Sequence, residues 1–545
     1  MKVAKPVLLT LIFIASSQFL MANNIVISNS SLTGRVLGSH TFVEFDLSWD
    51  NSFRLTAGPN NWDAAWVFVK YQITGGTGCT ASTVWRHATL SAVNGEHSVG
   101  ANLATINGVA DSRGVFIYRS DIASGTVNWT DLRVRWNYAA DGILDACSVT
   151  IRVFAMEMVL VPQGSFYCGD GSSGNTGKLE DATSGNPFLV TSATTPSTLG
   201  GGSAGSMGNN NALGQSTADD FNDVTSRTLP TTYPNGFNAF YAMKYEISQE
   251  QYAEFLNTLT GTQQSARFPS PVTVGSFFNT TANLLTPQAR NGIKCRIAPV
   301  GAAPGEFGCD LDDDDIFNET SGDGRFLACN WLSVPDLLAY LDWSGLRPMT
   351  EMEYEKASRG PLLPIANEFA WGNATLVSAS AVSNGGSDNE LVTTANANVS
   401  SNNAFSAGPL RSGVFATSTS TRVQAGATYY GIMEMTGNVW EDGVGLGSAA
   451  GRSYTGLHGD GSLITSGAAN VDFWPGINGN NTLTSVNLAF GGTTGCTGYA
   501  GMGFMAGSWR EGAYLQVSDR QFKAGWGGLT GRDNRNGGRG VRTAP

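Results

Sequence analysis

One acidic stretch of the sequence has the residue types and the spacing of a calcium-binding loop. In the segment CDLDDDDIFNETSGDG, which begins at residue 309, aspartates recur at every second position. The pattern would place side-chain oxygens at Asp310, Asp312, Asp314 and Asn318, and a main-chain carbonyl at Ile316. Five aspartates this close repel one another unless a cation neutralises them. We therefore predict Ca²⁺ as a ligand of this loop.

The same loop departs from the common calcium-loop pattern at two positions. Asp315 stands where a glycine is usual, and Ser321 stands where an acidic residue normally completes the coordination. A solvated acidic turn between two cysteines is therefore the alternative interpretation.

The C-terminal segment is rich in the residues that recognition surfaces use. After Gly507, aromatic and arginine residues alternate with glycines. Such side chains, on loops held by a rigid scaffold, commonly form binding surfaces. We predict that the ligand-binding residues are Arg510, Glu511, Tyr514, Trp526, Arg532, Asn534 and Arg535. Trp509 and Arg542 are expected in the folded core.

Histidine-based chemistry has few candidates. His40, His87 and His97 lie in the first 155 residues without metal-ligand spacing, and the only histidine after them is His458. One imidazole cannot build the usual non-haem iron site. The surroundings of His458 also lack the sequence context of a nucleophile elbow, so we expect a loop histidine there.

Composition narrows the class of protein. The chain of 545 residues has a net charge of -12, only 14% charged residues and 68 glycines. This length predicts two or three domains, and this composition is typical of a loop-rich, β-leaning globular protein. The absence of a Lys/Arg cluster argues against a nucleic-acid or anionic-membrane partner.

The sequence pattern predicts an α+β fold that positions these residues. Short apolar runs separated by turn residues predict an N-terminal β-sandwich over residues 23–155. A loop-rich domain follows over residues 156–545, with a Gly/Ser/Asn-rich insertion at about 170–220. Capping residues and apolar spacing predict helices over residues 248–259, 333–345 and 350–360.

The N-terminus and the cysteines indicate export. Residues 1–22 have two lysines, an apolar run and a small residue at Ala22, which is typical of a secretory signal peptide cleaved near that alanine. We therefore expect a secreted or cell-surface protein without a membrane span. Disulfides persist in such compartments. We predict a bond between Cys79 and Cys147, and another from Cys295 to Cys309 or Cys329.

Several stretches, in order, resemble the sulfatase-modifying-factor or formylglycine-generating-enzyme family, whose fold is related to C-type lectins. They are MVLVPQGSFYCGD, YEISQEQYAEFLN, CNWLSVPDLLAYLDWSGLRPMTEMEYEKASRG, YYGIMEMTGNVWED and AGSWREGAYLQVSDR through GGRGVR, and they span residues 158–545. The resemblance implies a formylglycine-generating-enzyme-like domain after the N-terminal sandwich. It does not fix the activity, since the fold carries copper oxidases, iron enzymes and binding proteins.

The resemblance also implies a second calcium site. By analogy with the family, the ligands would be the carboxylates of Glu434 and Glu441 and the carbonyls of Gly437 and Val439. A plain turn with two solvated acids is the alternative. Trp440 would point away from this site into the core.

The copper-dependent oxidases of the family use a cysteine pair after a GSW-like motif. In this chain the matching stretch is GSWREGAYLQVSDRQFKAG, and no cysteine follows Cys496. We therefore predict a secreted, catalytically inactive relative that acts as a calcium-stabilised binding or structural module for an unknown protein or glycan. The alternatives are a self-assembling subunit of an extracellular structure, and a metal-dependent oxidase with an unrecognised site.

Overall fold

A computed structural model describes residues 24–172, 178–210, 219–403, 405–480, 501–523 and 531–545 of the chain. It is mostly sheet with few helices, which confirms a β-rich α+β fold. Residues 1–22, predicted as a signal peptide, lie outside the described residues. Within the described ranges, no helix is both long enough and apolar enough to cross a membrane.

Two sheets organise the N-terminal third of the chain. A three-stranded antiparallel sheet has the order β1 (Val26–Val36), β2 (His40–Phe53), β7 (Ser124–Trp136). A seven-stranded sheet has the order β23 (Val541–Thr543), β15 (Phe240–Met243), β8 (Cys147–Val161), β3 (Asp63–Gly76), β6 (Val115–Arg119), β5 (Ala104–Gly108), and β4 (Arg86–His87) also pairs with β3. A 3-10 turn, η1, covers Asn94–Glu96.

Strand β3 is buried on both faces and so joins two cores. Ala65, Val67 and Val69 face a cluster that includes residues of β2 and β7. Trp66 and Phe68 point the opposite way, into the large core that contains the helices. This alternation follows from the two-residue period of a strand. The run is almost continuously apolar because neither face meets water.

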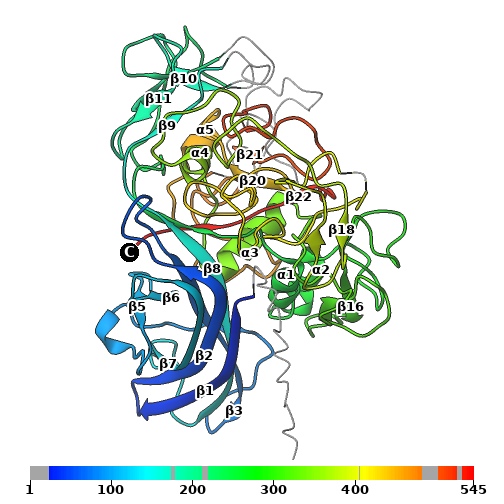
Figure 1. Cartoon of the computed structure of the whole chain (residues 1–545). Helices are drawn as coiled ribbons and strands as arrows, with labels where there is room; N and C mark the ends of the chain where they lie inside the picture. The colour runs from blue at the N-terminus through cyan, green and yellow to red at the C-terminus, as the bar shows by residue number, and fades with distance from the viewer. Residues whose placement is uncertain (1–23, 173–177, 211–218, 404, 481–500, 524–530) are drawn as a thin grey trace, which may run out of the picture.

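Strand β8 connects the N-terminal strands to the rest of the chain. It pairs with β3 along thirteen register positions and, near its end, with β15. Figure 1 shows it passing between the N-terminal strands below and the remaining elements above. The predicted boundary at residue 155 therefore falls inside one strand. Lys244 forms buried ion pairs with Glu157 on β8 and, at 3.9 Å, with Asp63 on β3.

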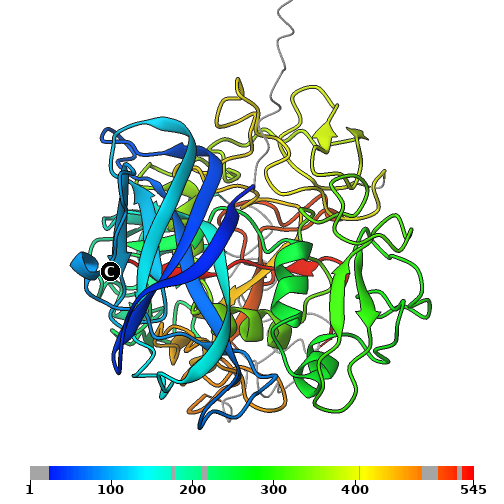
Figure 2. The same ribbon diagram turned by 90° about the horizontal axis from the view of Figure 1, so that it is seen from below.

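The remainder of the chain carries short strands joined by long loops. The four-stranded sheet has the order β10 (Leu179–Asp181), β13 (Met207–Asn209), β12 (Thr198–Leu199), β14 (Arg227–Thr228). Three pairs are β11 (Phe188–Val190) with β9 (Phe166–Cys168), β16 (Ile293–Ile297) with β17 (Glu306–Cys309), and β18 (Val382–Ser383) with β19 (Leu391–Val392). The last sheet has the order β21 (Met502–Met505), β20 (Trp440–Val444), β22 (Asn536–Gly537). Figure 2 shows β16 and β17, in green, on the side opposite the blue N-terminal strands.

Helix positions follow the capping residues of the sequence. The helices are α1 (Gln249–Leu256), α2 (Gly261–Arg267), α3 (Val334–Ser344), α4 (Glu351–Arg359) and α5 (Ala449–Arg452). The three predicted helices are confirmed as α1, α3 and α4, each with a reciprocal capping box at its start. Helix α3 ends at Gly345, whose φ of 73° favours glycine. Helix α2 was not predicted, although Thr260 and Gln263 form a capping box there too.

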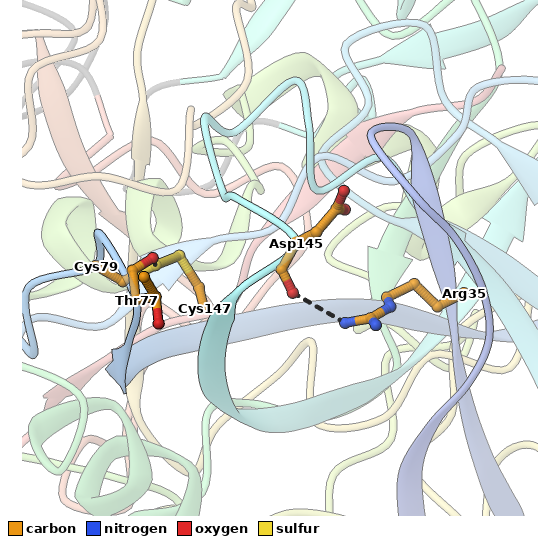
Figure 3. The surroundings of a disulfide bond; sticks show 5 residues. All are labelled: Arg35, Thr77, Cys79, Asp145 and Cys147. Carbon is orange, nitrogen blue, oxygen red and sulfur yellow. Dashed lines mark hydrogen bonds between the residues drawn. A yellow bond between two sulfur atoms is a disulfide. The ribbon is translucent and has the colours of Figure 1, made fainter.

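One of the predicted disulfides is confirmed. Cys79 and Cys147 are bonded and join the loop after β3 to the start of β8 (Figure 3). Near this bond, Nη1 of Arg35 donates a hydrogen bond to the carbonyl oxygen of Asp145 at 3.0 Å (Figure 3). The bond fastens two neighbouring strands of the large sheet at their free ends.

Candidate functional site

A cavity of about 340 Å³ lies beside the sheet of β20, β21 and β22. Its lining residues are Trp440, Phe504, Glu511, Tyr514, Phe522, Asp533, Arg535 and Asn536. The sheet supplies three of them, since Trp440 on β20 is the register partner of Asn536 on β22, and Phe504 lies on β21. The loops that follow Ser508 and Gly531 supply most of the others. Strand β20 and the C-terminal part of the chain from Phe504 onward therefore meet at one cavity.

Aromatic rings form one wall of the cavity. Trp440 contacts Phe504 at 5.7 Å and Phe522 edge-on at 5.3 Å between ring centroids. Tyr514 packs edge-on against Phe522 at 5.0 Å. Edge-to-face packing of this kind stabilises the rings in fixed positions. The backbone of Tyr514 has a φ of 68°, a left-handed conformation that costs a tyrosine about 1–2 kcal/mol.

An arginine between two carboxylates forms a polar wall of the cavity. Nη1 of Arg535 donates to Oε1 of Glu511 at 2.9 Å, and its Nε donates to Oδ1 of Asp533 at 2.7 Å. Ser508 donates a further hydrogen bond to Glu511. Hydrogen bonds to these carboxylates raise the pKa of Arg535 above its ordinary value, so the side chain stays charged. The wall therefore presents fixed donors and acceptors with a net negative charge.

The structure brings three of the predicted ligand-binding residues together: Glu511, Tyr514 and Arg535. Arg532 instead forms an ion pair with Asp336, with Nε to Oδ2 at 2.7 Å, so its role is structural. The carbonyl of Asn534 accepts hydrogen bonds from Trp509 and Asn330.

The two remaining predicted residues are Arg510 and Trp526. Arg510 is exposed and does not line the cavity. Trp526 lies outside the described residues. The lining residues that sequence reasoning missed are Trp440, Phe504, Phe522, Asp533 and Asn536. Asp533 and Asn536 flank the predicted pair 534–535, so their position in the sequence was a signal that could have identified them. Trp440 is 4% exposed, as expected of a core residue, yet it also lines the cavity.

The segment around Glu434 and Glu441, expected to bind calcium, is deeply buried and lies against a positive charge from the C-terminal part of the chain. Arg539 forms two hydrogen bonds with the carboxylate of Glu441. Oε1 of Glu434 accepts from the amide of Gly413 at 2.7 Å, while its Oε2 has no hydrogen-bond partner among the described atoms. Burial raises the pKa of Glu434 to about 7.

The backbone of this segment is also engaged. The amide of Val439 donates to Oε1 of Glu246 at 3.1 Å, and the amide of Gly437, whose φ is 83°, donates to the carbonyl of Ala506. In this structure, the guanidinium group of Arg539 is the positive charge beside Glu441. Calcium at this segment therefore stays a prediction, and it requires Arg539 to move.

The acidic loop after β17 is partly neutralised by Lys294. Its Nζ donates to Asp310 at 2.7 Å, to Asp313 at 2.6 Å and to Asp315 at 2.7 Å. The carboxylates of Asp310, Asp312 and Asp314 also lie within 4.8 Å of one another.

Two other residues of the expected calcium loop make local hydrogen bonds. The amide of Ile316 donates to Oδ1 of Asp314 at 2.8 Å. Oδ1 of Asn318 accepts from the amide of Cys309 at 2.9 Å, so this oxygen is aimed at the backbone.

Comparison with known proteins decides the family. Residues 150–442, more than half of the chain, match the sulfatase-modifying factor enzyme 1-like domain. The chain belongs to this family. No curated protein is a match for it. Among solved structures, one titled Major Tropism Determinant I1 Variant has 8% identity, covers 84% of this chain and 86% of that chain, and has a TM-score of 0.18. A TM-score this low carries no argument about this chain.

The oxidases of the sulfatase-modifying factor family depend on cysteine thiolates. Among the described residues, Cys168, Cys295, Cys309 and Cys329 are free and buried. The predicted disulfide from Cys295 to Cys309 or Cys329 is therefore wrong. Burial raises the pKa of all four thiols, which disfavours the thiolate form. None of them lines the cavity, and Cys496 lies outside the described residues.

Proposed function

We propose that this member of the sulfatase-modifying factor family is an exported binding protein that recognises a protein or glycan through the cavity beside β20, without oxidase activity. The observation that carries the proposal is the lining itself. The lining combines aromatic rings with Arg535, which forms ion pairs with Glu511 and Asp533. This combination of aromatic and arginine residues is typical of binding hot spots.

The size of the cavity limits what enters it. A volume of about 340 Å³ lies at the small end of ligand pockets. It suits one sugar ring or one protein side chain inserted from a larger partner. Tyr514 or Trp440 would contact the apolar face of such a group, while the carboxylates and the amide of Asn536 would accept or donate hydrogen bonds at its hydroxyl or amide groups.

The lining residues also bear on catalysis. The described lining contains no cysteine and no histidine. Its two carboxylates both form ion pairs with Arg535, so each already has a fixed partner inside the cavity. By the resemblance, the family's oxidases carry a cysteine pair a few residues after the GSW-like motif, and in that neighbourhood this chain has Arg510, Glu511 and Val517. These features support a binding role over an oxidase role.

The proposal includes the architecture expected from the sequence. The N-terminal strands form a β-sandwich, and the remainder forms a C-type-lectin-like domain that displays the cavity on loops. The packing of β2 and β7 against β3 supports the sandwich. The disulfide between Cys79 and Cys147 supports an oxidising, extracellular location.

Arrays of glycans and of extracellular proteins test the proposal directly. The purified chain from residue 23 onward should bind a restricted set of ligands. The variant Arg535→Ala should lose these ligands, whereas Arg510→Ala, the same change at an exposed residue outside the cavity, should keep them. Binding that survives Arg535→Ala, or a chain that binds nothing on either array, would contradict a recognition role for the cavity.

A role as a subunit of an extracellular assembly is favoured by a separate observation. Strand β1 forms one edge of the three-stranded sheet, and among the described strands it pairs with β2 alone. Val26 and Val36 on it are half exposed. Exposed edges with apolar side chains are templates for pairing with another chain. Light scattering across a concentration series should then show oligomers, and the variant Val36→Lys should be monomeric under the same conditions.

A further inference from the structure

We propose that the loop between Asp310 and Asp323 binds one divalent cation, Ca²⁺, through the carboxylates of Asp310, Asp312, Asp314 and Asp323. Asp323 is the residue that sequence reasoning did not include. The site is independent of the cavity beside β20, and its failure would leave the proposed binding function untouched.

Three of the carboxylates already converge. Asp310 follows the last residue of β17, is completely buried and receives the amide of Asp314 on Oδ1 at 3.0 Å. This hydrogen bond turns the loop back on itself. As a result, carboxylate oxygens of Asp310, Asp312 and Asp314 lie within 4.8 Å of one another. Oxygens bound to one Ca²⁺ at about 2.4 Å are separated by distances of this order.

Asp323 provides the independent observation that points to a ligand. It is completely buried, and its Oδ2 accepts from the amide of Glu319 at 2.5 Å. Its Oδ1 is buried with no hydrogen-bond partner among the described atoms. An unpaired buried carboxylate oxygen costs free energy, and natural proteins rarely keep one without a ligand.

The unpaired oxygen belongs to a side chain that faces the acidic loop. The carboxylate of Asp312 lies within hydrogen-bonding reach of Asp323, and the charges of Asp310 and Asp312 both act on Asp323. The carboxylate of Asp312 also packs on the neighbouring backbone, because a Cβ added at Gly322 would lie 2.2 Å from its Oδ2. Two carboxylates therefore lie within hydrogen-bonding reach of each other.

Lys294 does not fill this role. Its ammonium group contacts Asp310, Asp313 and Asp315, which form a second group of converging carboxylates. Across the described part of the chain, no basic side chain forms an ion pair with Asp312, Asp314 or Asp323, the remaining carboxylates of the proposed site. Lys294 thus neutralises Asp310, Asp313 and Asp315. Asp312, Asp314 and Asp323 have no ion-pair partner among the described side chains, and Asp310 is shared between the two sets.

The chemistry of the donors selects the cation. All four are carboxylates, which are hard oxygen ligands, and the set contains no histidine or cysteine of the kind that zinc or copper prefers. Asp312 and Asp314 are exposed, so water can supply the remaining ligands of a six- to eight-coordinate ion. Irregular loop oxygens suit Ca²⁺ better than the strict octahedron of Mg²⁺.

Calorimetric titration of the chelator-treated chain with CaCl₂ tests the site. Ca²⁺ should bind, and Asp312→Asn and Asp323→Asn should each weaken the dissociation constant at least tenfold. Asp313→Asn is the matched control, since it removes the same charge from the same loop at a carboxylate that Lys294 neutralises, and it should change the constant less than twofold. Glu441→Gln should also leave this binding intact, which separates the loop from the segment around Glu434.

Three results would overturn the proposal. The first is the absence of any heat of binding up to millimolar Ca²⁺. This result would mean that Asp312 and Asp323 share a proton and bind no cation. The second is equal loss of affinity in Asp313→Asn and Asp312→Asn, and the third is equal affinity for Mg²⁺. Thermal melts of Asp323→Asn without Ca²⁺ should show an unchanged or higher Tm, so lost affinity in this variant reflects a lost ligand and not an unfolded loop.

Discussion

Arg539 and Glu441 form a completely buried, bidentate ion pair between the β20 strand and the C-terminal segment. Nη2 and Nε of Arg539 lie 2.6 Å and 2.7 Å from the two carboxylate oxygens. The charges of Glu246 and Glu434 also act on Arg539. The positive charge of one guanidinium group therefore interacts with three buried carboxylates, at the segment where the family resemblance predicts calcium.

Replacing Arg539 with methionine should destabilise the protein strongly. Removing one partner of a buried pair leaves an uncompensated charge, which typically costs about 3–5 kcal/mol. Urea unfolding should show this loss, and adding Glu441→Gln to Arg539→Met should recover part of it. The exposed pair of Arg296 and Glu306 gives the control, since Arg296→Met should change the free energy of unfolding by less than about 1 kcal/mol.

Calcium added to Arg539→Met provides a second readout. If the segment keeps the family's capacity for calcium, the ion should replace the guanidinium group and raise the Tm of this variant more than that of the unaltered protein, in which only the loop at Asp310 would bind it. An equal shift of both would place the calcium elsewhere, and the loop at Asp310 is then the first candidate.

Copper-loaded protein should not convert a sulfatase-type cysteine peptide to the aldehyde. Copper(I) requires soft thiolate ligands. The free cysteines of the described chain are buried, with pKa values raised by burial, and Cys496 precedes the GSW stretch. Mass spectrometry of the peptide after incubation is the measurement. Aldehyde formed clearly above a control without protein would restore the oxidase alternative.

Tyr514→Ala should weaken binding of any ligand found on the arrays by about 2 kcal/mol or more, the usual hot-spot threshold. The ring offers a large rigid contact surface beside Phe522, and its side chain is only partly buried. Tyr514→Phe keeps the ring and should retain most of the affinity if stacking dominates. Tyr167→Ala, at a partly exposed tyrosine on β9, is the control for unspecific loss. A fall in Tm for Tyr514→Ala would show that the ring belongs to the core instead.

Breaking the bond between Cys79 and Cys147 should destabilise the N-terminal strands. The bond closes a loop with a sequence separation of 68 residues, for which loop-closure entropy corresponds to about 4 kcal/mol. The double variant Cys79→Ser/Cys147→Ser should therefore melt at a lower temperature. Reducing agent should lower the Tm of the unaltered protein but leave this variant unchanged, because the described remaining cysteines are already free.

Local signals in the sequence predicted the helices well, because capping residues act over three or four positions. Ser248, Ser333 and Thr350 each start a helix as expected, and each makes the reciprocal hydrogen bonds of a capping box. The position of β8 could not be predicted in the same way. Its register partners lie 71–96 residues earlier in β3 (Gly76 with Cys147, Asp63 with Val159) and 79–85 residues later in β15 (Phe240 with Val161, Met243 with Met158), and nothing in a local pattern specifies such partners.

The candidate site shows the same difference between local signals, which the sequence reveals, and long-range packing, which it does not. Glu511, Tyr514 and Arg535 were identified from residue type, since aromatic and arginine residues on glycine-rich loops favour recognition. Arg532 has the same signal but pairs with Asp336 on α3, almost 200 residues earlier in the chain. Which of two neighbouring arginines reaches the cavity is decided by long-range packing, so residue type alone could not separate them.

The free energy of unfolding should fall as pH rises from about 4 to about 8 through the contribution of Asp342. This carboxylate on α3 is completely buried and accepts amide hydrogen bonds from Asp460 at 2.9 Å and Asn470 at 3.0 Å. Burial, followed by the charge of Asp460, raises its pKa to about 7, against the partial compensation of Lys70. A raised carboxylate pKa means that the folded state holds a proton the unfolded state has released. The resulting stability is complete below the unfolded pKa and is lost as pH passes through 7.

Asp460→Asn should flatten this pH dependence, because it removes the like charge and keeps the oxygen that accepts from Ser462. Each unit by which the pKa of Asp342 falls should add about 1.4 kcal/mol to the free energy of unfolding at pH 8 and almost nothing at pH 4. Urea unfolding at both pH values measures the difference. Asp472→Asn removes one charge at an exposed aspartate nearby in sequence and should shift both values equally. A parallel shift in Asp460→Asn as well would mean that Asp460 does not control the titration of Asp342.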